Sequence, residues 1–330
     1  MNNQPTSVGH LTVQPDEELA GPAFDLPLAS RHQYLQAVHR GYSLMKSRRV
    51  VIAGLARDLE EILPLTIRRI EALGHLFSEY RVIVYENDST DRSLELLQAW
   101  ARSNPRVTIC SEIRNDPVNL AERCLSRATR MAYYRSQCQR QIADYHSNFD
   151  NVVLVDMDLI GGWSHDGVAN TFGHSNWDFV GAFGIIFRRQ LLAPNCITHY
   201  DAWAYRTDEA YTPMTTKEVN SILFRRGDPL QAITSCFGGL GIYRMPAYLA
   251  GCYDGTDVEH VTFHRKMRDR GYQRTYLNPS QITIYGRKHR TLDHVAARML
   301  RAVDTLPGRT PVEWSYPKAD ESNDYRKRAA

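Results

Sequence analysis

The feature that most constrains this chain is an apolar run that ends on two aspartates. Residues 151–162 read NVVLVDMDLIGG, in which four branched apolar residues come directly before Asp156. An unbroken apolar run of this length predicts a strand buried on both faces. Residues two apart in an extended segment point the same way, so we expect the side chains of Asp156 and Asp158 to share a face.

Two carboxylates at the end of a strand are hard oxygen ligands, which Mg²⁺ and Mn²⁺ prefer. A cation of this kind with open positions suits an enzyme that handles a diphosphate leaving group. The alternative interpretation of the same residues is a strand followed by a polar turn, with both acids simply solvated. The rest of the chain is needed to choose between the two.

From residue 49, short apolar segments alternate with longer amphipathic ones. Strands are predicted at residues 50–54, 81–85, 107–110 and 152–155, and helices at residues 59–73, 93–102 and 120–145. Strand–helix alternation predicts an α/β fold with a central, mostly parallel sheet flanked by helices. Ligands bind beyond the carboxyl ends of such strands. Residues 53–57, 86–91 and 156–158 are therefore expected along one rim.

After residue 160 the pattern changes to short strands and turns. Strands are predicted at residues 179–186, 235–243 and 281–285, with a helix at residues 258–270. This favours a mixed or antiparallel continuation of the same sheet. Because no linker-like composition separates the halves, we expect an N-terminal arm and helix (1–46) and two halves of one domain (47–160 and 161–330).

Composition and charge narrow the classes of partner and compartment. With 40 basic and 37 acidic residues the net charge is +3, so nothing indicates a nucleic-acid partner. The six cysteines show no CxxC spacing, which is typical of reduced thiols in a cytoplasmic protein. No apolar run approaches the roughly 20 residues of a membrane span, and pairs of basic residues are compatible with peripheral contact to a membrane.

A second motif lies at residues 81–97, RVIVYENDSTDRSLELL. Its acids suit a turn and a helix N-cap, or they hydrogen-bond the base and ribose of a nucleotide. A strand ending in END-STD, followed downstream by a strand ending in DxD, resembles GT-A-fold glycosyltransferases. The resemblance is greatest to the inverting family-2-like transferases and to the fungal capsule-associated α-mannosyltransferases. It extends from about residue 50 to about residue 289.

This resemblance implies that residues 47–160 bind a nucleotide donor. The implied donor-binding residues are Ala53, Gly54, Leu55 and Arg57 after the first strand, Glu86 and Asp88 after the second, and Arg123, Arg127 and Arg130 on a helix. A solvated basic face is the alternative for those last three arginines. Asp156 and Asp158 are then implied to hold the metal that bridges the donor's diphosphate.

The acceptor half, residues 161–330, carries two further motifs. Residues 200–204, YDAWA, resemble a segment of the capsule-associated enzymes, which implies sugar contacts for Asp201 and Trp203. The alternative is a loop residue and a core tryptophan. Residues 235–241, SCFGGLG, contain Gly238 and Gly239, which allow close approach to acceptor and diphosphate or simply form a tight turn.

Residues 254–260, DGTDVEH, open a helix with acids in its first turn. Capping and the helix dipole explain such acids without function. In inverting relatives an acidic pair here supplies the catalytic base, which implies Glu259 first and Asp257 second. The usual motif pairs adjacent acids, whereas here His260 follows Glu259. In a retaining enzyme, Glu259 is not required as a base.

A basic segment, residues 285–290, reads YGRKHR. Many enzymes with the GT-A fold add a C-terminal histidine to the metal ligands, which implies His289 for that role. Arg287 and Lys288 are implied to neutralise the leaving diphosphate. A solvated histidine in a basic loop is the alternative interpretation.

The sequence therefore predicts a metal-dependent glycosyltransferase that uses Mn²⁺ or Mg²⁺. It moves a sugar from a UDP- or GDP-sugar to a glycan or glycolipid acceptor. Two alternatives stay open: a non-catalytic nucleotide- or carbohydrate-binding protein, and a nucleotidyltransferase. The last normally shows a Gly-rich phosphate loop with a lysine near the first strand, which residues 54–61, GLARDLEE, lack.

Overall fold

The structure, a computed structural model, describes residues 26–117, 124–188, 196–222 and 224–285. The strands are β1 (Arg49–Ala56), β2 (Glu79–Asn87), β3 (Val107–Glu112), β4 (Asn151–Asp156), β5 (Gly162–Trp163), β6 (Phe179–Arg188), β7 (Cys196–His199), β8 (Gln231–Ala232), β9 (Leu240–Arg244) and β10 (Thr275–Ile284). The helices are α2 (Leu28–Met45), α3 (Leu63–Gly74), α4 (Ser93–Ser103), α5 (Leu125–His146), α6 (His165–Phe172), α7 (Thr216–Ser221), α8 (Met245–Ala250) and α9 (Glu259–Asp269), with a 3₁₀ turn η1 (Ala202–Ala204).

All of these strands belong to one sheet, in the order β3-β2-β1-β4-β9-β6-β10-β5, with β7 on β6 and β8 on β10. The first four strands of this order are parallel to one another. Strand β9 is antiparallel to both β4 and β6, and β10 is parallel to β6. The predicted α/β class, with a mostly parallel first half and a mixed second half, is confirmed.

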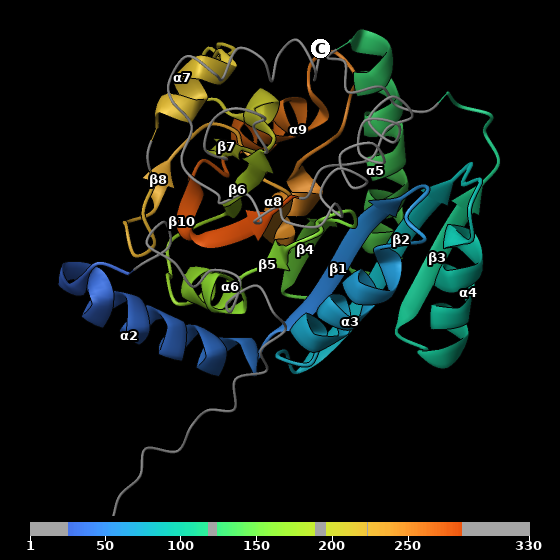
Figure 1. The fold of residues 1–330 in the computed structure, drawn as a ribbon, viewed down its shortest axis with the longest axis horizontal. Coiled ribbons are helices and arrows are strands. Elements are labelled where there is room, and N and C mark those ends of the chain that lie inside the picture. Colours follow the sequence, from blue (N-terminus) through green and yellow to red (C-terminus); the bar gives the residue numbers. More distant parts are fainter. Residues whose placement is uncertain (1–25, 118–123, 189–195, 223, 286–330) are drawn as a thin grey trace, which may run out of the picture.

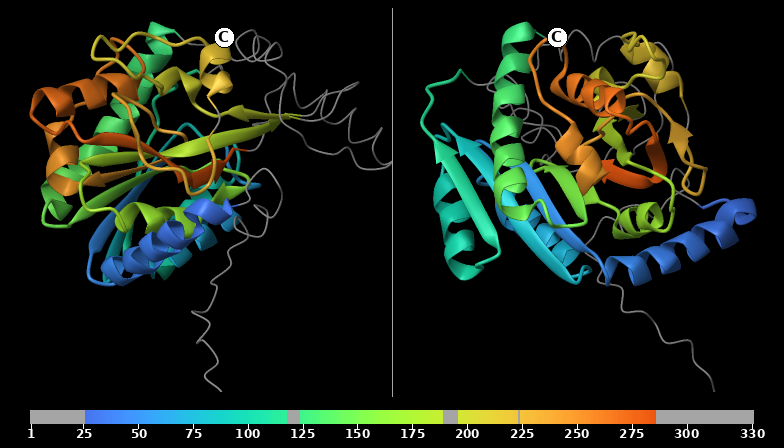
Figure 2. Two further views of the ribbon diagram at one scale, coloured as in Figure 1. Left: turned by 90° about the vertical axis from the view of Figure 1, so that its left-hand side faces the viewer. Right: turned by 180° about the vertical axis from the view of Figure 1, so that it is seen from behind.

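Helices cover both faces of the sheet (Figures 1 and 2). The strands supply the cores on the two faces with alternate residues. Val50 and Ile52 of β1 pack into a core that α3 and α4 share. Val51 and Ala53 pack into a second core, with α5 and α9. Because β1 is buried on both sides, its continuous apolar sequence is the pattern expected of a central parallel strand.

Two predicted element boundaries were wrong in the second half. The strand expected at residues 235–243 begins only at Leu240, because Gly238 and Gly239 adopt positive φ angles of 63° and 84° in a turn before it. The strand expected at residues 281–285 is β10, which begins at Thr275. A β-bulge between Asn278 and Ile282 interrupts its pairing with β6, and this irregularity weakened the sequence signal.

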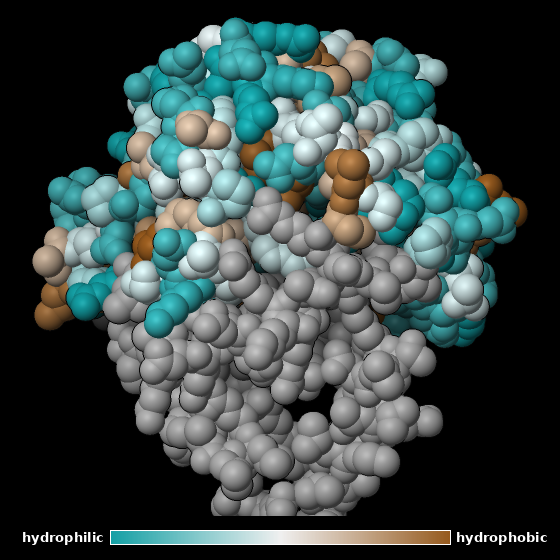
Figure 3. Space-filling model, turned by 90° about the horizontal axis from the view of Figure 1, so that it is seen from above, coloured by the Kyte–Doolittle hydropathy of each residue, from teal (hydrophilic) through white to brown (hydrophobic). Residues whose placement is uncertain are grey.

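The parallel strands β1, β2 and β3 end on the upper side of Figure 1. Seen from that side, the described surface is mostly hydrophilic, with apolar side chains scattered over it (Figure 3). Among the residues described, no helix combines the length and the apolar character that crossing a bilayer requires.

Candidate functional site

The two aspartates of the DxD motif lie at the end of β4, the strand that separates the parallel half from the mixed half. Met157 between them is 1% exposed, and its carbonyl oxygen accepts a hydrogen bond from Thr66 Oγ1 at 2.9 Å. Asp156 and Asp158 are both partly exposed. Only Asp156 belongs to β4, because Met157 and Asp158 lie in the turn that follows it, so the predicted common face of an extended segment stays a prediction.

Both carboxylate oxygens of Asp156 have partners within the protein. Oδ1 lies 3.2 Å from Nη2 of Arg135, and Oδ2 accepts a hydrogen bond from the Tyr200 hydroxyl at 2.7 Å. Burial raises the pKa of Asp156 to about 6; Arg135 opposes this rise, and the charge of Asp158 adds to it. The two aspartates are thus close enough to repel each other, which is the condition under which a shared cation binds well.

Arg135 also reaches an acid from the other half of the chain. Its Nε lies 3.2 Å from Oε1 of Glu259, in the first turn of α9. Each of these two side chains is only 6% exposed. The guanidinium carbon lies 4.9 Å from the centre of the Phe237 ring. Burial acts against the charged form, but Asp156 and Glu259 hold the pKa of Arg135 above its usual value.

A fourth acid completes the group. Asp201 has a left-handed backbone conformation, with φ of 57°, just before the turn η1. Its Oδ2 is buried and accepts no hydrogen bond from the described residues. Burial raises the pKa of Asp201 well above its usual value, and the charges of Asp156 and Glu259 raise it further. We call Asp156, Asp158, Asp201 and Glu259 the acid cluster.

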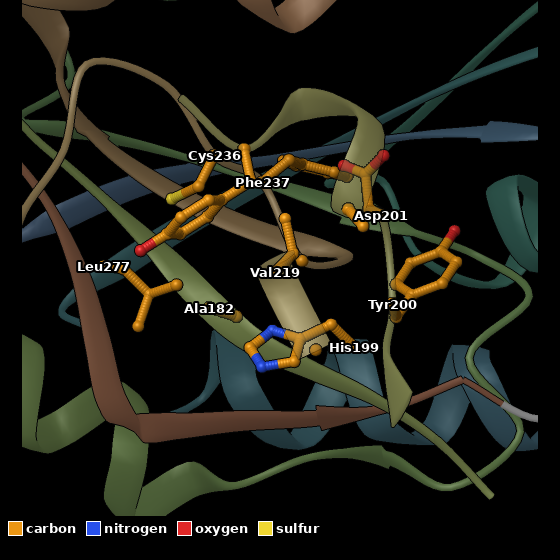
Figure 4. A pocket seen from close by; sticks show the side chains of 12 residues that line it. Ala182, His199, Tyr200, Asp201, Val219, Cys236, Phe237 and Leu277 are labelled. Atoms are coloured by element: carbon orange, nitrogen blue, oxygen red, sulfur yellow. The ribbon is translucent and has the colours of Figure 1, made fainter. Parts of the chain in front are cut away.

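A small pocket lies beside the acid cluster and has room for little more than a water molecule. Tyr200 and Asp201 are on one side of it in Figure 4, and Cys236 and Leu277 are on the other. Phe237, under the guanidinium of Arg135, lines it as well. The only sequence-predicted site residues in its lining are Asp201 and Gly238, among the residues described.

Gly238 and Gly239 form the turn that abuts the end of β4. The carbonyl oxygen of Gly239 accepts a hydrogen bond from the backbone N–H of Asp156 at 2.9 Å. A Cβ on Gly238 would lie 2.1 Å from the carbonyl oxygen of Ala182, so only glycine fits. The turn therefore fixes the backbone of Asp156, and any contact of these glycines with an acceptor stays a prediction.

Glu86 and Asp88, predicted to contact the nucleotide, have their carboxylates engaged by other parts of the chain. Glu86 accepts hydrogen bonds from the N–H of Ser89 at 2.9 Å and the hydroxyl of Ser111 at 2.6 Å. Asp88 accepts the backbone N–H groups of residues 114, 115 and 116 at 2.7–3.0 Å. Burial acts against its charge, but hydrogen bonds from Asn87 and from these N–H groups lower the pKa of Asp88 to about 2.

The other donor-side residues surround the same loop or the strand below it. Arg57 donates to the carbonyl oxygens of Asp116 and Pro117, at 2.9 and 3.3 Å, so it helps Asp88 to hold the loop of residues 114–117. Ala53 is buried in the core beneath α5. A Cβ on Gly54 would lie 2.8 Å from Met157 Sδ, which makes Gly54 a packing partner of the DxD turn.

The remaining predicted residues have the following positions. Trp203 has its ring 5.5 Å from the guanidinium carbon of Arg127 on α5, and Arg130 is partly exposed on the same helix. Asp257 lies 3.7 Å from Nη2 of the buried Arg206, on the approach to α9. Outside the described residues are Arg123, Arg287, Lys288 and His289.

Sequence reasoning missed Arg135 and the hydroxyl of Tyr200. The predicted basic face of α5 named Arg127 and Arg130, but Arg135, two turns after Arg127, is the arginine that reaches the acid cluster. A residue eight positions after Arg127 shares its helix face, and this spacing was a usable signal. Nothing in the sequence pairs Tyr200 with Asp156, which is 44 residues away.

The acid cluster suits a divalent cation whose coordination is completed by a bound ligand rather than by protein side chains alone. Within the described ranges, no group of three or more His, Cys, Asp or Glu residues could hold a metal ion. Asp156 and Asp158 alone match the usual Mg²⁺ arrangement, in which one or two carboxylates act together with substrate phosphates. The chemistry of this donor set therefore fits Mg²⁺ or Mn²⁺ bound together with a diphosphate.

Comparison with known proteins gives likenesses in structure only. No protein-family model matches the chain, and no curated protein matches it. A solved structure described as the mannosyltransferase PcManGT from Pyrobaculum calidifontis, in complex with GDP-Man and Mn²⁺, matches with a TM-score of 0.43 and 13% identity, covering 86% of this chain and 76% of that one.

Glucosyl-3-phosphoglycerate synthase from Mycobacterium tuberculosis, in complex with Mn²⁺, UDP and phosphoglyceric acid, matches with a TM-score of 0.41 and 15% identity, covering 82% and 81% of the two chains. TarS 1-349 from S. aureus matches with a TM-score of 0.41 and 11% identity, covering 85% and 70%. Likenesses at this level establish neither an activity nor a substrate for this chain.

Proposed function

We propose that this chain is a glycosyltransferase that takes a UDP- or GDP-sugar as donor and a glycan or glycolipid as acceptor. In this proposal Asp156 and Asp158 hold Mn²⁺ or Mg²⁺. The observation that carries it is the acid cluster, in which Arg135 joins Asp156 at the end of β4 to Glu259 on α9, and the charges of Asp158 and Asp201 interact with that of Asp156. Buried like charges are costly, so their convergence favours a functional role.

On the donor side, the bound cation would stabilise the negative charge that develops on a departing nucleotide diphosphate. The protein's own residues prepare that site, because Arg135 and Tyr200 fix the orientation of Asp156. Asp88, Glu86 and Arg57 belong to the proposed nucleotide side, where two of them brace the loop of residues 114–117. The proposed donor-binding set also includes Ala53, Gly54 and Arg130.

On the acceptor side, Glu259 is the proposed base, which takes a proton from the attacking hydroxyl. Its Oε1 is oriented by Arg135, and Asp257 is the second choice for this role. Asp201 and Trp203 are the proposed sugar contacts, with Gly238 and Gly239 beside them. The proposal keeps His289 as a further metal ligand. Assignment of the product anomer will distinguish inversion from retention of configuration.

The proposal also includes a cytoplasmic location, with peripheral contact to a membrane surface and no nucleic-acid partner. Its support is chemical. Cys110, Cys138, Cys236 and Cys252 are thiols rather than disulfides, as reduced cytoplasmic cysteines would be. The net charge of +3 on 330 residues is too small to indicate a polyanionic partner.

The test begins with thermal unfolding of the chain in the presence of UDP or GDP, with Mn²⁺ or with EDTA. We expect one nucleotide to raise the unfolding temperature only when Mn²⁺ is present. A panel of UDP- and GDP-sugars, with assignment of the anomer formed, then identifies the donor and the stereochemistry. The matched control is Asp144→Asn, which removes a carboxylate from the exposed surface of α5.

Each alternative function has its own outcome in this test. Stabilisation by a nucleotide regardless of Mn²⁺, without turnover of any donor, supports a binding protein. Release of pyrophosphate from a nucleoside triphosphate supports a nucleotidyltransferase. Either result would replace the glycosyltransferase proposal.

A further inference from the structure

Arg135 joins the two ends of the acid cluster. One nitrogen of its guanidinium, Nη2, faces Oδ1 of Asp156, and another, Nε, faces Oε1 of Glu259, both at 3.2 Å. The two acids come from different elements, and Glu259 is 124 residues away from Arg135 in sequence. The arginine itself is 5% exposed. It therefore supplies positive charge between Asp156 and Glu259.

A buried charge needs a partner, because transfer from water costs several kcal/mol that only a close opposite charge or hydrogen bonds can offset. Arg135 meets this need for Asp156 and for Glu259 at once. A divalent cation at Asp156 and Asp158 would bind the same Asp156 carboxylate that the guanidinium now contacts. Two cations cannot share one carboxylate without repelling each other.

We infer that Arg135 is the resident counter-ion of the acid cluster and competes with the divalent cation for Asp156. This inference rests on the proposed function, which assigns the cation to Asp156 and Asp158. Arg135 is thus a positioning residue that weakens binding of the metal alone. A metal that arrives with a nucleotide diphosphate brings further ligands and overcomes the competition. The site then favours the cation–nucleotide pair over the free cation.

The sharpest test removes the competitor without changing the net charge of the group. The double variant Arg135→Gln/Glu259→Gln deletes one positive and one negative charge together, so the net charge of the group is conserved while the cation beside Asp156 is removed. Mn²⁺ is titrated without nucleotide, and the EPR signal of the free ion gives its dissociation constant. We expect the double variant to bind Mn²⁺ about three- to tenfold more tightly than the unmodified chain.

Two further variants separate this effect from a structural role. Arg135→Lys keeps the positive charge, so its Mn²⁺ affinity should stay within about threefold of the unmodified chain. Arg140→Gln removes an arginine from an exposed position on the same helix and should not change the affinity. An arginine with only a structural role would have the opposite signature, because a loosened site binds Mn²⁺ more weakly.

The outcomes are distinguishable from failure of the proposed function. Tighter Mn²⁺ binding in the double variant, and not in Arg135→Lys, supports the inference. Equal or weaker binding in a folded double variant overturns it and leaves the proposed function standing. If the double variant does not fold, the unfolding temperatures of Arg135→Lys and of the unmodified chain are compared with and without Mn²⁺. We then expect Mn²⁺ to raise both temperatures equally, and a smaller rise in Arg135→Lys overturns the inference. Absence of Mn²⁺ binding from every form, with UDP or GDP present, overturns both.

Discussion

Two aspartates, each at the end of a strand next to β1, have opposite environments. Asp88 follows β2, and its carboxylate accepts three backbone N–H groups of residues 114–116. Asp156 ends β4, and its carboxylate contacts one arginine and one tyrosine, with two further acids nearby. The pKa of Asp88 is lowered to about 2, whereas that of Asp156 is raised to about 6.

The difference shows how one residue type serves two purposes at the same rim. Fixed backbone donors stabilise the charge of Asp88 and use it to anchor a loop, so this carboxylate is already neutralised. Burial raises the cost of the charge on Asp156 and the charge of Asp158 adds to it, while its main charged partner is a single arginine side chain, Arg135. A carboxylate in that situation gains most from a cation.

The largest effect is expected for Asp156→Asn. The amide cannot provide the anionic oxygen that the proposed cation requires, so turnover of the donor sugar should fall about a thousandfold. Stability should change by less than about 1 kcal/mol, because Arg135 keeps Glu259 as its partner and the cost of burying the Asp156 charge is removed. Donor turnover and urea unfolding measure the two quantities. A folded variant with unchanged turnover would contradict the role of Asp156.

Asp88→Asn should show the reverse pattern. An asparagine has one acceptor oxygen, and its NH₂ group would face backbone N–H donors that Asp88 now accepts. We expect a loss of about 2–3 kcal/mol in the free energy of unfolding, measured with urea, and only a small loss of turnover. Asp144→Asn, on the exposed surface of α5, is the control. A variant that keeps its stability but loses nucleotide affinity would make Asp88 a ligand-binding residue and remove the contrast.

The positions of the two aspartates at strand ends were predictable from the sequence, but their contacts were not. Alternating apolar and amphipathic segments predicted β1, β2 and β4 and placed Asp88 and Asp156 at strand ends, because burial on both faces leaves a continuous apolar run. The partners of these acids were not predictable. Nothing local indicates that residues 114–116 turn their N–H groups toward Asp88.

The strands of the mixed half were harder to predict, because their positions also depend on contacts between distant parts of the chain. The predicted strand at residues 235–243 merged a glycine turn with β9, since an apolar sequence does not reveal the backbone φ of Gly238. That β9 inserts antiparallel between β4 and β6 depends on pairing between distant residues, as between Val152 and Tyr243. Long-range pairing of this kind has no local sequence code. The bridge that Arg135 makes between Asp156 and Glu259 depends on it.

Mild acid should distinguish the two regions by their histidines. Burial lowers the pKa of His165 and His199 to about 4 and that of His264 to about 3. The unfolded chain binds these protons near pH 6.5, so the contribution of these histidines to stability is complete above that pH and decreases as the pH falls toward 4. Protonation of Asp156, whose pKa is raised to about 6, acts in the opposite direction over the same range. We expect a loss of about 1 kcal/mol per histidine by pH 5.5. Asp88, with its low pKa, adds nothing in this range.

Urea unfolding between pH 7.5 and 5.5 measures this loss. His199→Gln, in the mixed half beside the pocket, should reduce the dependence on pH. His39→Gln changes an exposed histidine on α2 and should leave the dependence as it is. If the free energy of unfolding is the same at every pH in this range, the buried histidines do not destabilise the folded chain in mild acid. The contrast between the mixed half and the region of Asp88 then does not extend to the histidines.

The smallest effect is expected for Tyr200→Phe. The substitution removes the hydrogen bond to Asp156 Oδ2 but keeps the ring that stacks on Tyr285 at 4.1 Å. One hydrogen bond to a carboxylate that retains Arg135 is worth about 1 kcal/mol, so turnover should fall less than tenfold. Tyr42→Phe is a matched control, because Tyr42 donates to Asp166 over the same 2.7 Å away from the acid cluster. A loss as large as that of Asp156→Asn would mean that Tyr200, rather than Arg135, is the partner that holds Asp156 in place.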